Sequence, residues 1–195
     1  MKNWVSLLLV GSLFASCNNY KLVVMSKGEA KINAETGSIA STDGAGHTEQ
    51  SVATSSKHWT VESPAGKAIF DLSEKGLYVV NAKNDTIIGS YQNYVSAEKS
   101  GQIISQEMLA QKLDSLKQLA EGKNVSVANR NFYILPNQAV RVTGNVDAEI
   151  VGPYHKMTSA ASKNGEAPEV YRFYSIKEIR ETIGKLEELT SPVVK

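Results

Sequence analysis

The chain has 195 residues, with 21 basic and 20 acidic side chains, a formal net charge of +1 at pH 7 and a single cysteine. This length suffices for one domain with a substantial hydrophobic core. The balanced charge and the absence of a Lys/Arg cluster argue against a nucleic-acid partner. One cysteine also excludes intramolecular disulfides and zinc sites built from several thiolates.

The first 16 residues have the layout of a secretory signal peptide. A charged residue, Lys2, is followed by the apolar run WVSLLLVGSLFA and by small residues directly before Cys17. This run is shorter than the roughly 20 apolar residues that a membrane-spanning helix needs. We therefore expect residues 1–16 to be cleaved from the mature protein.

The residues at this cleavage point resemble the lipobox of bacterial lipoprotein precursors: Phe14, Ala15 and Ser16 precede Cys17. The resemblance implies that the Cys17 sulfur receives a diacylglyceryl group and that the new amino terminus is acylated, as with palmitate. It also implies an outer-membrane location in the cell envelope, since Asn18 supplies no inner-membrane retention signal. The commoner residue at position 14 would be leucine. An ordinary signal peptide with a chance cysteine, and a buried thiol in a cytosolic protein, are the alternatives.

Residues 17–57 are expected to form an anchored segment followed by a tether. The apolar run 20–25 and the alternation of Ala30, Ile32 and Ala34 predict one or two strands near the anchor. Residues 35–57 are rich in Ser, Thr, Gly and Ala and carry almost no large apolar side chain. They predict a flexible tether, which leads into a single domain over 58–195.

Residues 58–174 contain short runs rich in β-branched and aromatic residues, separated by turn-forming residues. This pattern predicts the strands of an antiparallel, meander-like sheet. The candidate strands, in chain order, are HWTVES, KAIFDLS, GLYVVNA, DTIIGSYQNYV, NVSVA, NFYILP, QAVRVT, AEIVG and EVYRFY. The pair Asn84-Asp85 favours a tight turn, so we expect a hairpin that joins residues 77–82 to 86–91.

Two segments have the apolar periodicity of amphipathic helices. The first covers 105–121, with Ser105 as N-cap and Gly122 just past its end. The second starts at the capping box formed by Ser175 and Glu178 and ends near Pro192. The aromatic residues of the preceding strand, Tyr171, Phe173 and Tyr174, are expected to pack onto this second helix. The predicted fold is therefore α+β, with one helix between two strand blocks and one at the C-terminus.

The three histidines, His47, His58 and His155, have no partners at metal-ligand spacing. Asp43, His47 and Glu49 are close in sequence, but a Gly-rich loop offers no fixed geometry, so we expect no metal site. Glycine-rich phosphate loops, Gly-x-Ser-x-Gly elbows and HExxH motifs are absent from the sequence, which indicates no cofactor and identifies no catalytic residue.

Two residues are candidates for binding. His155 follows Gly152-Pro153 in a loop, and loops often carry function, although a plain surface turn is the preferred interpretation. Trp59 offers a ring on which a sugar would stack, although its large apolar area also suits an inward-facing strand residue.

Two functions remain open from the sequence. The first is a non-enzymatic binding, assembly or accessory lipoprotein with an envelope protein partner. The second is an envelope hydrolase acting on glycan or peptide, whose acidic and histidine groups meet only in the fold. Histidine and carboxylates converging in one pocket would favour the enzyme, whereas a filled core and an exposed apolar patch would favour the binding module.

Overall fold

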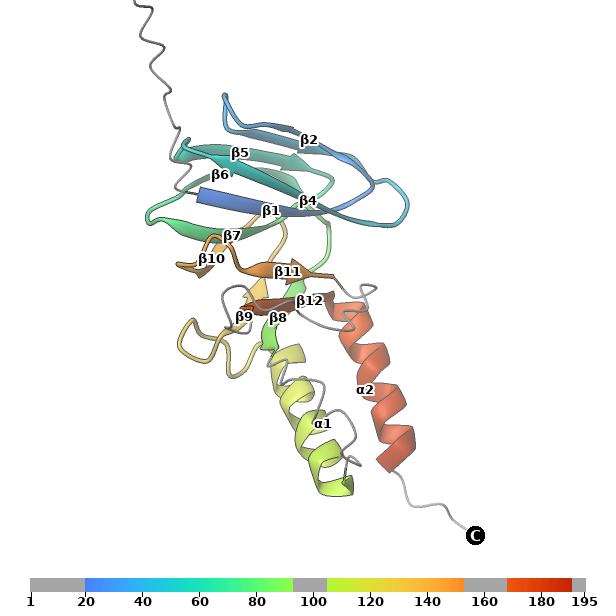
Figure 1. Ribbon diagram of the computed structural model, residues 1–195. Coiled ribbons are helices and arrows are strands. Elements are labelled where there is room, and N and C mark those ends of the chain that lie inside the picture. The colour runs from blue at the N-terminus through green and yellow to red at the C-terminus, as the bar shows by residue number, and fades with distance from the viewer. Residues whose placement is uncertain (1–19, 93–104, 153–167, 191–195) are drawn as a thin grey trace, which may run out of the picture.

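The computed structural model describes residues 20–92, 105–152 and 168–190. Three four-stranded sheets and a pair of helices are stacked as layers (Figure 1). The outer sheet has the order β2 (Ala30–Asn33), β3 (Ser38–Ser41), β5 (His58–Ser63), β6 (Gly66–Asp71). The central sheet has the order β10 (Ala139–Thr143), β7 (Gly76–Asn81), β1 (Tyr20–Lys27), β4 (His47–Thr54).

The third sheet, here called the helix-side sheet, has the order β11 (Glu149–Val151), β12 (Val170–Ser175), β8 (Ile87–Gln92), β9 (Asn131–Ile134). The helices α1 (Gln106–Ala120) and α2 (Ile176–Thr190) lie side by side beyond it. The predicted α+β class, with one helix between strand blocks and one at the C-terminus, is confirmed. The strands form three sheets and include the parallel pairs β1–β7, β3–β5 and β11–β12.

The central sheet is covered on both faces, which explains the continuous apolar runs of β1 and β7. Alternate side chains of a strand point to opposite faces. Leu22 and Val24 therefore join the core shared with the outer sheet, whereas Val23 and Met25 join the core shared with the helix-side sheet. All four are at most 5% exposed.

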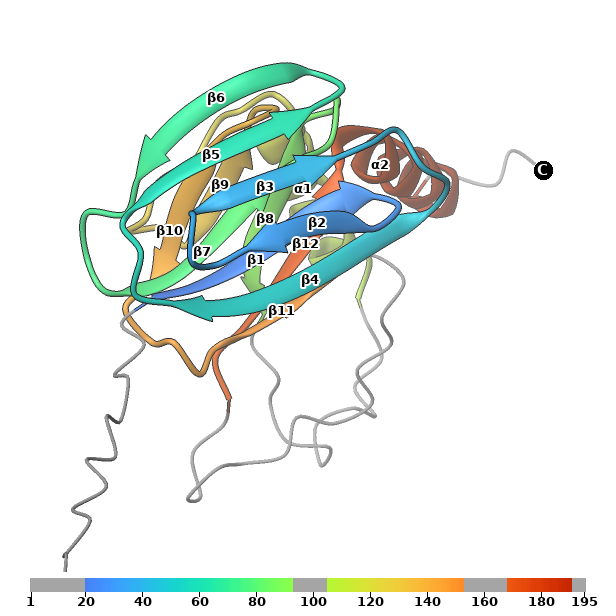
Figure 2. The same ribbon diagram turned by 90° about the horizontal axis from the view of Figure 1, so that it is seen from above.

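The core between the outer and central sheets is built around Trp59. Figure 2 shows the outer sheet lying across the central sheet. The Trp59 side chain packs there with Val61 and Tyr78, and its Nε1 donates a hydrogen bond to the carbonyl of Ser56 at 3.1 Å. A buried indole with its N–H satisfied contributes a large apolar area to this core.

The second core lies between the central and helix-side sheets and is rich in aromatic rings. Phe132 lies between Phe173 and Tyr171, with ring centroids 6.2 and 5.8 Å apart. Gly89 on β8 makes room for this packing, because a Cβ there would lie 2.2 Å from the Phe173 ring. The expectation that all three aromatic residues of β12 pack onto α2 is wrong for Tyr171 and Phe173. Strand alternation turns only Tyr174 toward the helices.

The helices begin where their caps predict. The Ser105 hydroxyl accepts a hydrogen bond from the Met108 N–H at the start of α1. At α2 the Glu178 carboxylate accepts from the Ser175 N–H at 2.6 Å and the Ser175 hydroxyl accepts from the Glu178 N–H at 3.2 Å, a reciprocal capping box. No described helix is long and apolar enough to cross a membrane.

The flexible tether expected at residues 35–57 is wrong, because this segment contains β3 and β4. Strand β4 pairs with β1 along its whole length, from Tyr20↔Thr54 to Lys27↔His47. As an edge strand with one partner, it can be built from small polar residues. Strand β1, whose place was left open by the sequence, lies inside the central sheet.

The expected hairpin between residues 77–82 and 86–91 is also wrong. Strand β7 pairs with β1 and β10 in the central sheet, whereas β8 pairs with β12 and β9 in the helix-side sheet. Between them, Asn81 Nδ2 donates to the carbonyls of Asp85 and Ile134 at 2.8 and 3.0 Å. The turn-forming residues therefore carry the chain from one sheet to the next. The candidate strand NVSVA forms only an isolated bridge, Ser126↔Asn131.

Candidate functional site

A hollow of about 530 Å³ opens where the central sheet meets the start of α2. It lies at the end of β1 and β4 that is opposite Tyr20, since Lys27 and His47 are paired there. Four parts of the chain line it: the end of β1, the start of β4, the β7–β8 connection, and the junction of β12 with α2. Its lining residues are Lys27, Gly46, His47, Lys83, Asp85, Ser175, Lys177 and Glu178.

Two of the lining residues, Lys83 and His47, form a row of polar side chains with Glu49, which lies next to His47 outside the lining of the hollow. His47 and Glu49 lie two residues apart on β4, so they point to the same face of the strand. His47 Nε2 lies 2.6 Å from Glu49 Oε1, and Lys83 Nζ lies 2.5 Å from His47 Nδ1. We call this row the Lys83–His47–Glu49 chain.

The Lys83–His47–Glu49 chain has the arrangement of a proton relay. An imidazole between an amine and a carboxylate can hold the shared proton on either side, as ammonium and neutral ring or as amine and imidazolium. Lys83 is only 6% exposed. This burial lowers the pKa of its ammonium group, although the negative charges of Glu178, Glu49 and Asp85 act in the opposite direction.

The backbone of Gly152 lies directly against the side chains of His47 and Glu49. A Cβ at this position would lie 1.7 Å from Glu49 Oε1 and 2.6 Å from His47 Nε2. Only a residue without a side chain allows the backbone to approach the imidazole–carboxylate pair this closely. The backbone of Gly152 therefore shields this pair from water.

The arrangement does not suit a metal ion. Both ring nitrogens of His47 already face protein partners, Lys83 and Glu49. Asp43, the third member of the trio considered from the sequence, lies 3.6 Å from Lys27 instead. Within the described residues, no group of three or more His, Cys, Asp or Glu side chains could hold a metal.

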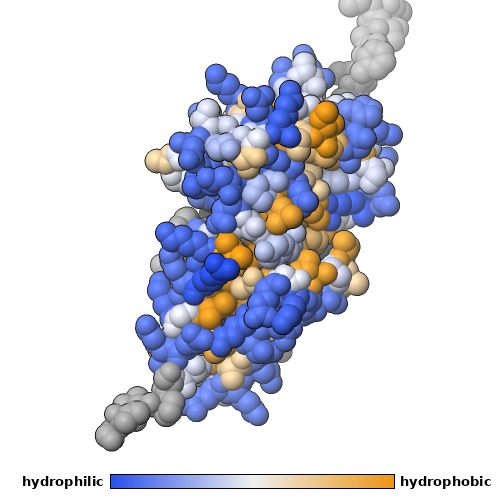
Figure 3. Space-filling view, turned by 180° about the vertical axis from the view of Figure 1, so that it is seen from behind, coloured by the Kyte–Doolittle hydropathy of each residue, from blue (hydrophilic) through white to orange (hydrophobic). Residues whose placement is uncertain are grey.

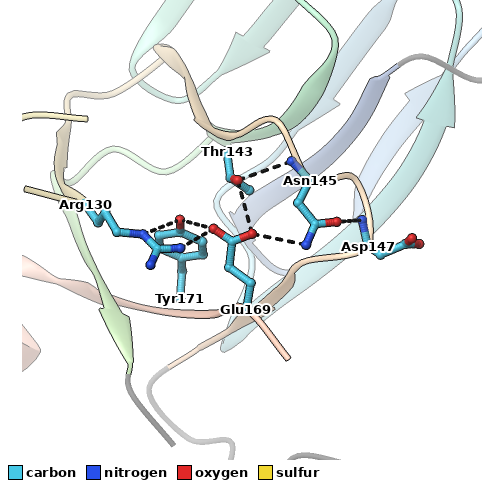
Figure 4. Close-up of polar contacts among 6 residues, drawn as sticks. All are labelled: Arg130, Thr143, Asn145, Asp147, Glu169 and Tyr171. Carbon is cyan, nitrogen blue, oxygen red and sulfur yellow. Dashed lines mark hydrogen bonds and ion pairs between the residues drawn. The ribbon is translucent and has the colours of Figure 1, made fainter. Parts of the chain in front are cut away.

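A second polar cluster surrounds Glu169, just before β12 (Figure 4). Its Oε1 accepts hydrogen bonds from the Tyr171 hydroxyl at 2.6 Å and from Arg130, and its Oε2 accepts from Thr143 at 3.2 Å and Asn145 at 3.1 Å. Burial alone would raise the pKa of this carboxyl, but the hydrogen bonds outweigh it and the pKa falls below the ordinary value.

Arg130 completes the Glu169 cluster from the other side. Its guanidinium lies 3.7 Å from the centroid of the Tyr91 ring, a cation–π contact, while it also pairs with Glu169. The carboxylate thus has four side-chain donors and the guanidinium has an aromatic face. Because every strong group is satisfied, this cluster serves to join β9, β10 and β12.

Of the other candidate site residues considered from the sequence, none belongs to either polar cluster within the described part of the chain. Trp59 is 1% exposed, which leaves no ring face for a sugar. His58 Nδ1 lies 2.5 Å from Asp71 Oδ1, but this pair is exposed on the outer sheet and lines no hollow described above. His155 and Cys17, the residue expected to carry lipid, lie outside the described residues.

Sequence reasoning missed Lys83 and the role of His47. The one local signal was the spacing of His47 and Glu49, which places both on one face if the segment is a strand. No protein-family model matches the chain, and neither the curated proteins nor the solved structures contain a significant match.

Proposed function

We propose that the chain is a lipoprotein of the cell envelope, held at the outer membrane through acylated Cys17, and that its domain is a non-enzymatic binding or accessory subunit for an envelope protein. The anchor rests on the signal-peptide layout and the lipobox-like residues before Cys17. Two or more acyl chains suffice for stable membrane attachment.

The described fold gives this anchor a specific geometry. Strand β1 begins at Tyr20, so only Asn18 and Asn19 separate it from Cys17. Three residue steps reach at most about 11 Å. An anchored domain would therefore sit directly against the bilayer, with the Tyr20 end of the central sheet nearest to it. The hollow, at the other end of β1, would face away at a distance of about 23 Å.

The observation that carries the binding function is an apolar surface. Figure 3 shows hydrophobic side chains gathered across the middle of one face, with hydrophilic side chains on both sides. Among the described residues, the exposed large apolar side chains are Ile69, Leu189 and Val127, at 75%, 70% and 61%, together with Met108 and Leu135; they belong to different elements, from β6 to the end of α2. Exposed apolar surface rimmed by polar residues is typical of protein–protein interaction sites.

The anchor is tested by the intact mass of the protein. The full precursor and its Cys17→Ser variant are expressed in a bacterial host, and the membranes are fractionated. We expect a triacyl mass increment in the outer-membrane fraction that the variant lacks. An unmodified, soluble wild-type protein would refute the anchor.

The binding role is tested by site-specific crosslinking in intact membranes. A photoreactive amino acid replaces Val127, Leu135 or Ile69 in turn, and exposed Lys67 serves as the control position. A discrete adduct of constant mass from one or more apolar positions, absent at Lys67, is expected. Identical patterns at all four positions would contradict a specific apolar interface.

The alternative, an envelope hydrolase acting on glycan or peptide, is favoured by one observation. Lys83 and His47 line a hollow, and the Glu49 carboxylate contacts His47 from outside it, so a base is combined with a carboxylate that orients it, as general base catalysis requires. Hydrolysis of isolated envelope glycan or peptide by the wild type, abolished in His47→Gln, would replace the binding role by this one.

A further inference from the structure

We propose that Lys83 is a nucleophilic amine that captures a small anionic aldehyde or ketone in the hollow as an imine. This inference concerns the hollow alone, so it stands or falls separately from the lipid anchor and from the apolar surface.

Lys83 differs from the two other lysines that line the hollow. Lys177 is exposed on the first turn of α2, and Lys27 lies 3.6 Å from the carboxylate of Asp43. Lys83 is buried, and its Nζ contacts the Nδ1 of His47 rather than a carboxylate. A carboxylate partner would hold the ammonium form, whereas a neutral imidazole can accept its proton.

The Lys83–His47–Glu49 chain supplies the proton transfers that imine formation requires. His47 Nδ1 takes a proton from the Lys83 ammonium, and Glu49 stabilises the resulting imidazolium through Nε2. The freed lone pair of Nζ attacks the carbonyl carbon and gives a carbinolamine. The imidazolium returns a proton to the departing hydroxyl, one water molecule leaves, and the C=N bond forms. No oxidant or reductant takes part.

The charges around the hollow select an anionic ligand. Its two acidic residues are already engaged, since Asp85 accepts from the Thr86 N–H at 2.8 Å and Glu178 accepts from the Ser175 N–H at 2.6 Å. Lys177 is exposed on α2, and the ion pair of Lys27 with Asp43 is itself exposed, so a carboxylate or phosphate can bind Lys177 and compete with Asp43 for Lys27. A volume of about 530 Å³ lies within the range of small-molecule sites.

The pKa of Lys83 depends on its burial and on the charged groups around it. Burial acts most strongly and lowers the pKa of Lys83. Glu178 of α2, Glu49 of β4 and Asp85 of the connecting segment act against burial, whereas Lys27 of β1 acts with it. The net direction is downward, so Lys83 reaches its neutral, nucleophilic form at lower pH than an exposed lysine.

The experiment is reductive trapping on the purified full chain. Pyridoxal 5′-phosphate, an anionic aldehyde, is added with sodium borohydride at a series of pH values, and the labelled lysines are mapped by mass spectrometry. We expect Lys83 to be labelled several-fold faster than Lys177 near neutral pH, because burial lowers the pKa of Lys83 and leaves more of its amine in the neutral form. Lys177 serves as an internal control because it lines the same hollow.

Two further measurements separate the parts of the proposal. His47→Gln should slow labelling of Lys83 and shift its pH profile upward, with Lys177 unaffected. 5′-Deoxypyridoxal, which lacks the phosphate and cannot close to a hemiacetal, should lower the ratio of Lys83 to Lys177 labelling if the ligand must be anionic. Labelling of Lys83 that is equal to or weaker than that of Lys177 at every pH would overturn the proposal, and this readout needs no variant that might misfold.

Discussion

The two polar clusters of this molecule use buried charge in opposite ways. Glu169 accepts hydrogen bonds from four side chains, so its charge is compensated and it joins three strands. Within the described residues, Lys83 Nζ has one side-chain hydrogen-bond partner, the imidazole of His47. The first cluster stabilises the fold. The second retains a buried amine at a cost in stability, which is typical of functional sites.

The largest expected effect is the loss of the Glu169 charge. Glu169→Gln removes the negative charge that pairs with Arg130 and turns one of the two accepting oxygens into an NH2 donor, so we expect a loss of about 2 kcal/mol in the free energy of unfolding. Urea denaturation of the wild type and the variant measures this difference in the free energy of unfolding. Glu74→Gln is the matched control, because the ion pair of Glu74 with Arg141 is exposed and should change stability by less than about 0.5 kcal/mol. Equal losses in both variants would show that the Glu169 cluster carries no special stability.

A smaller loss of stability is expected from a substitution of Gly152, whose backbone lies against His47 and Glu49. In Gly152→Ala the new Cβ would collide with the Glu49 carboxylate, which must swing away from His47. Loss of this hydrogen bond should cost about 1 kcal/mol and slow the trapping of Lys83.

Gly184→Ala is the matched control for Gly152→Ala. No heavy atom lies within 4 Å of the position of its added Cβ, and it replaces a helical glycine. This substitution should stabilise the protein by up to about 1 kcal/mol and leave trapping unchanged. If Gly152→Ala left trapping unchanged as well, Glu49 would have no part in the reactivity of Lys83.

Removal of the buried amine should have an effect of the opposite sign. Lys83→Met replaces a buried, incompletely compensated charge by an apolar side chain of similar length, so stability should be unchanged or rise by about 1 kcal/mol. The midpoint of urea denaturation gives the comparison with wild type. A loss above about 2 kcal/mol would place Lys83 with Glu169, as a structural residue.

The two clusters should also respond to pH in separate ranges. The folded pKa of Glu169 lies below its unfolded value, so its stabilisation is complete above the unfolded value and is lost as pH falls through the folded one. The folded pKa of Lys83 lies below 10.5, so the unfolded chain binds more protons between these values and stability rises there with pH. Stability curves of wild type and Lys83→Met should therefore differ in slope only in that alkaline range. Parallel curves would contradict a lowered pKa.

The sequence predicts what local hydrogen bonds and local packing determine. Ser105, Ser175 and Glu178 cap backbone groups within three residues, so both helix starts were predictable. The antiparallel pairing of β5 with β6 agrees with the expected meander, because these strands are neighbours in sequence and only Pro64 and Ala65 lie between them.

Pairing between distant segments left no local signal. The residues of β4 read as a tether because their strand character comes from β1, which supplies the hydrogen bonds and the apolar side chains. The turn Asn84-Asp85 was recognised, but β7 has its partners in β1 and β10, so the turn joins two sheets. For the same reason His47 and Lys83, which are 36 residues apart, meet only in the fold.

The place of β1 also has a consequence for the time course of folding. It is the first described strand of the chain, yet it lies inside the central sheet, between β4 and β7, and the sheet is completed only by β10. Contacts that are so distant in sequence slow folding, because long loops must close before the sheet is stable. During synthesis the central sheet therefore cannot be completed before residues 139–143 have been made, so its last backbone pairing waits for most of the described chain.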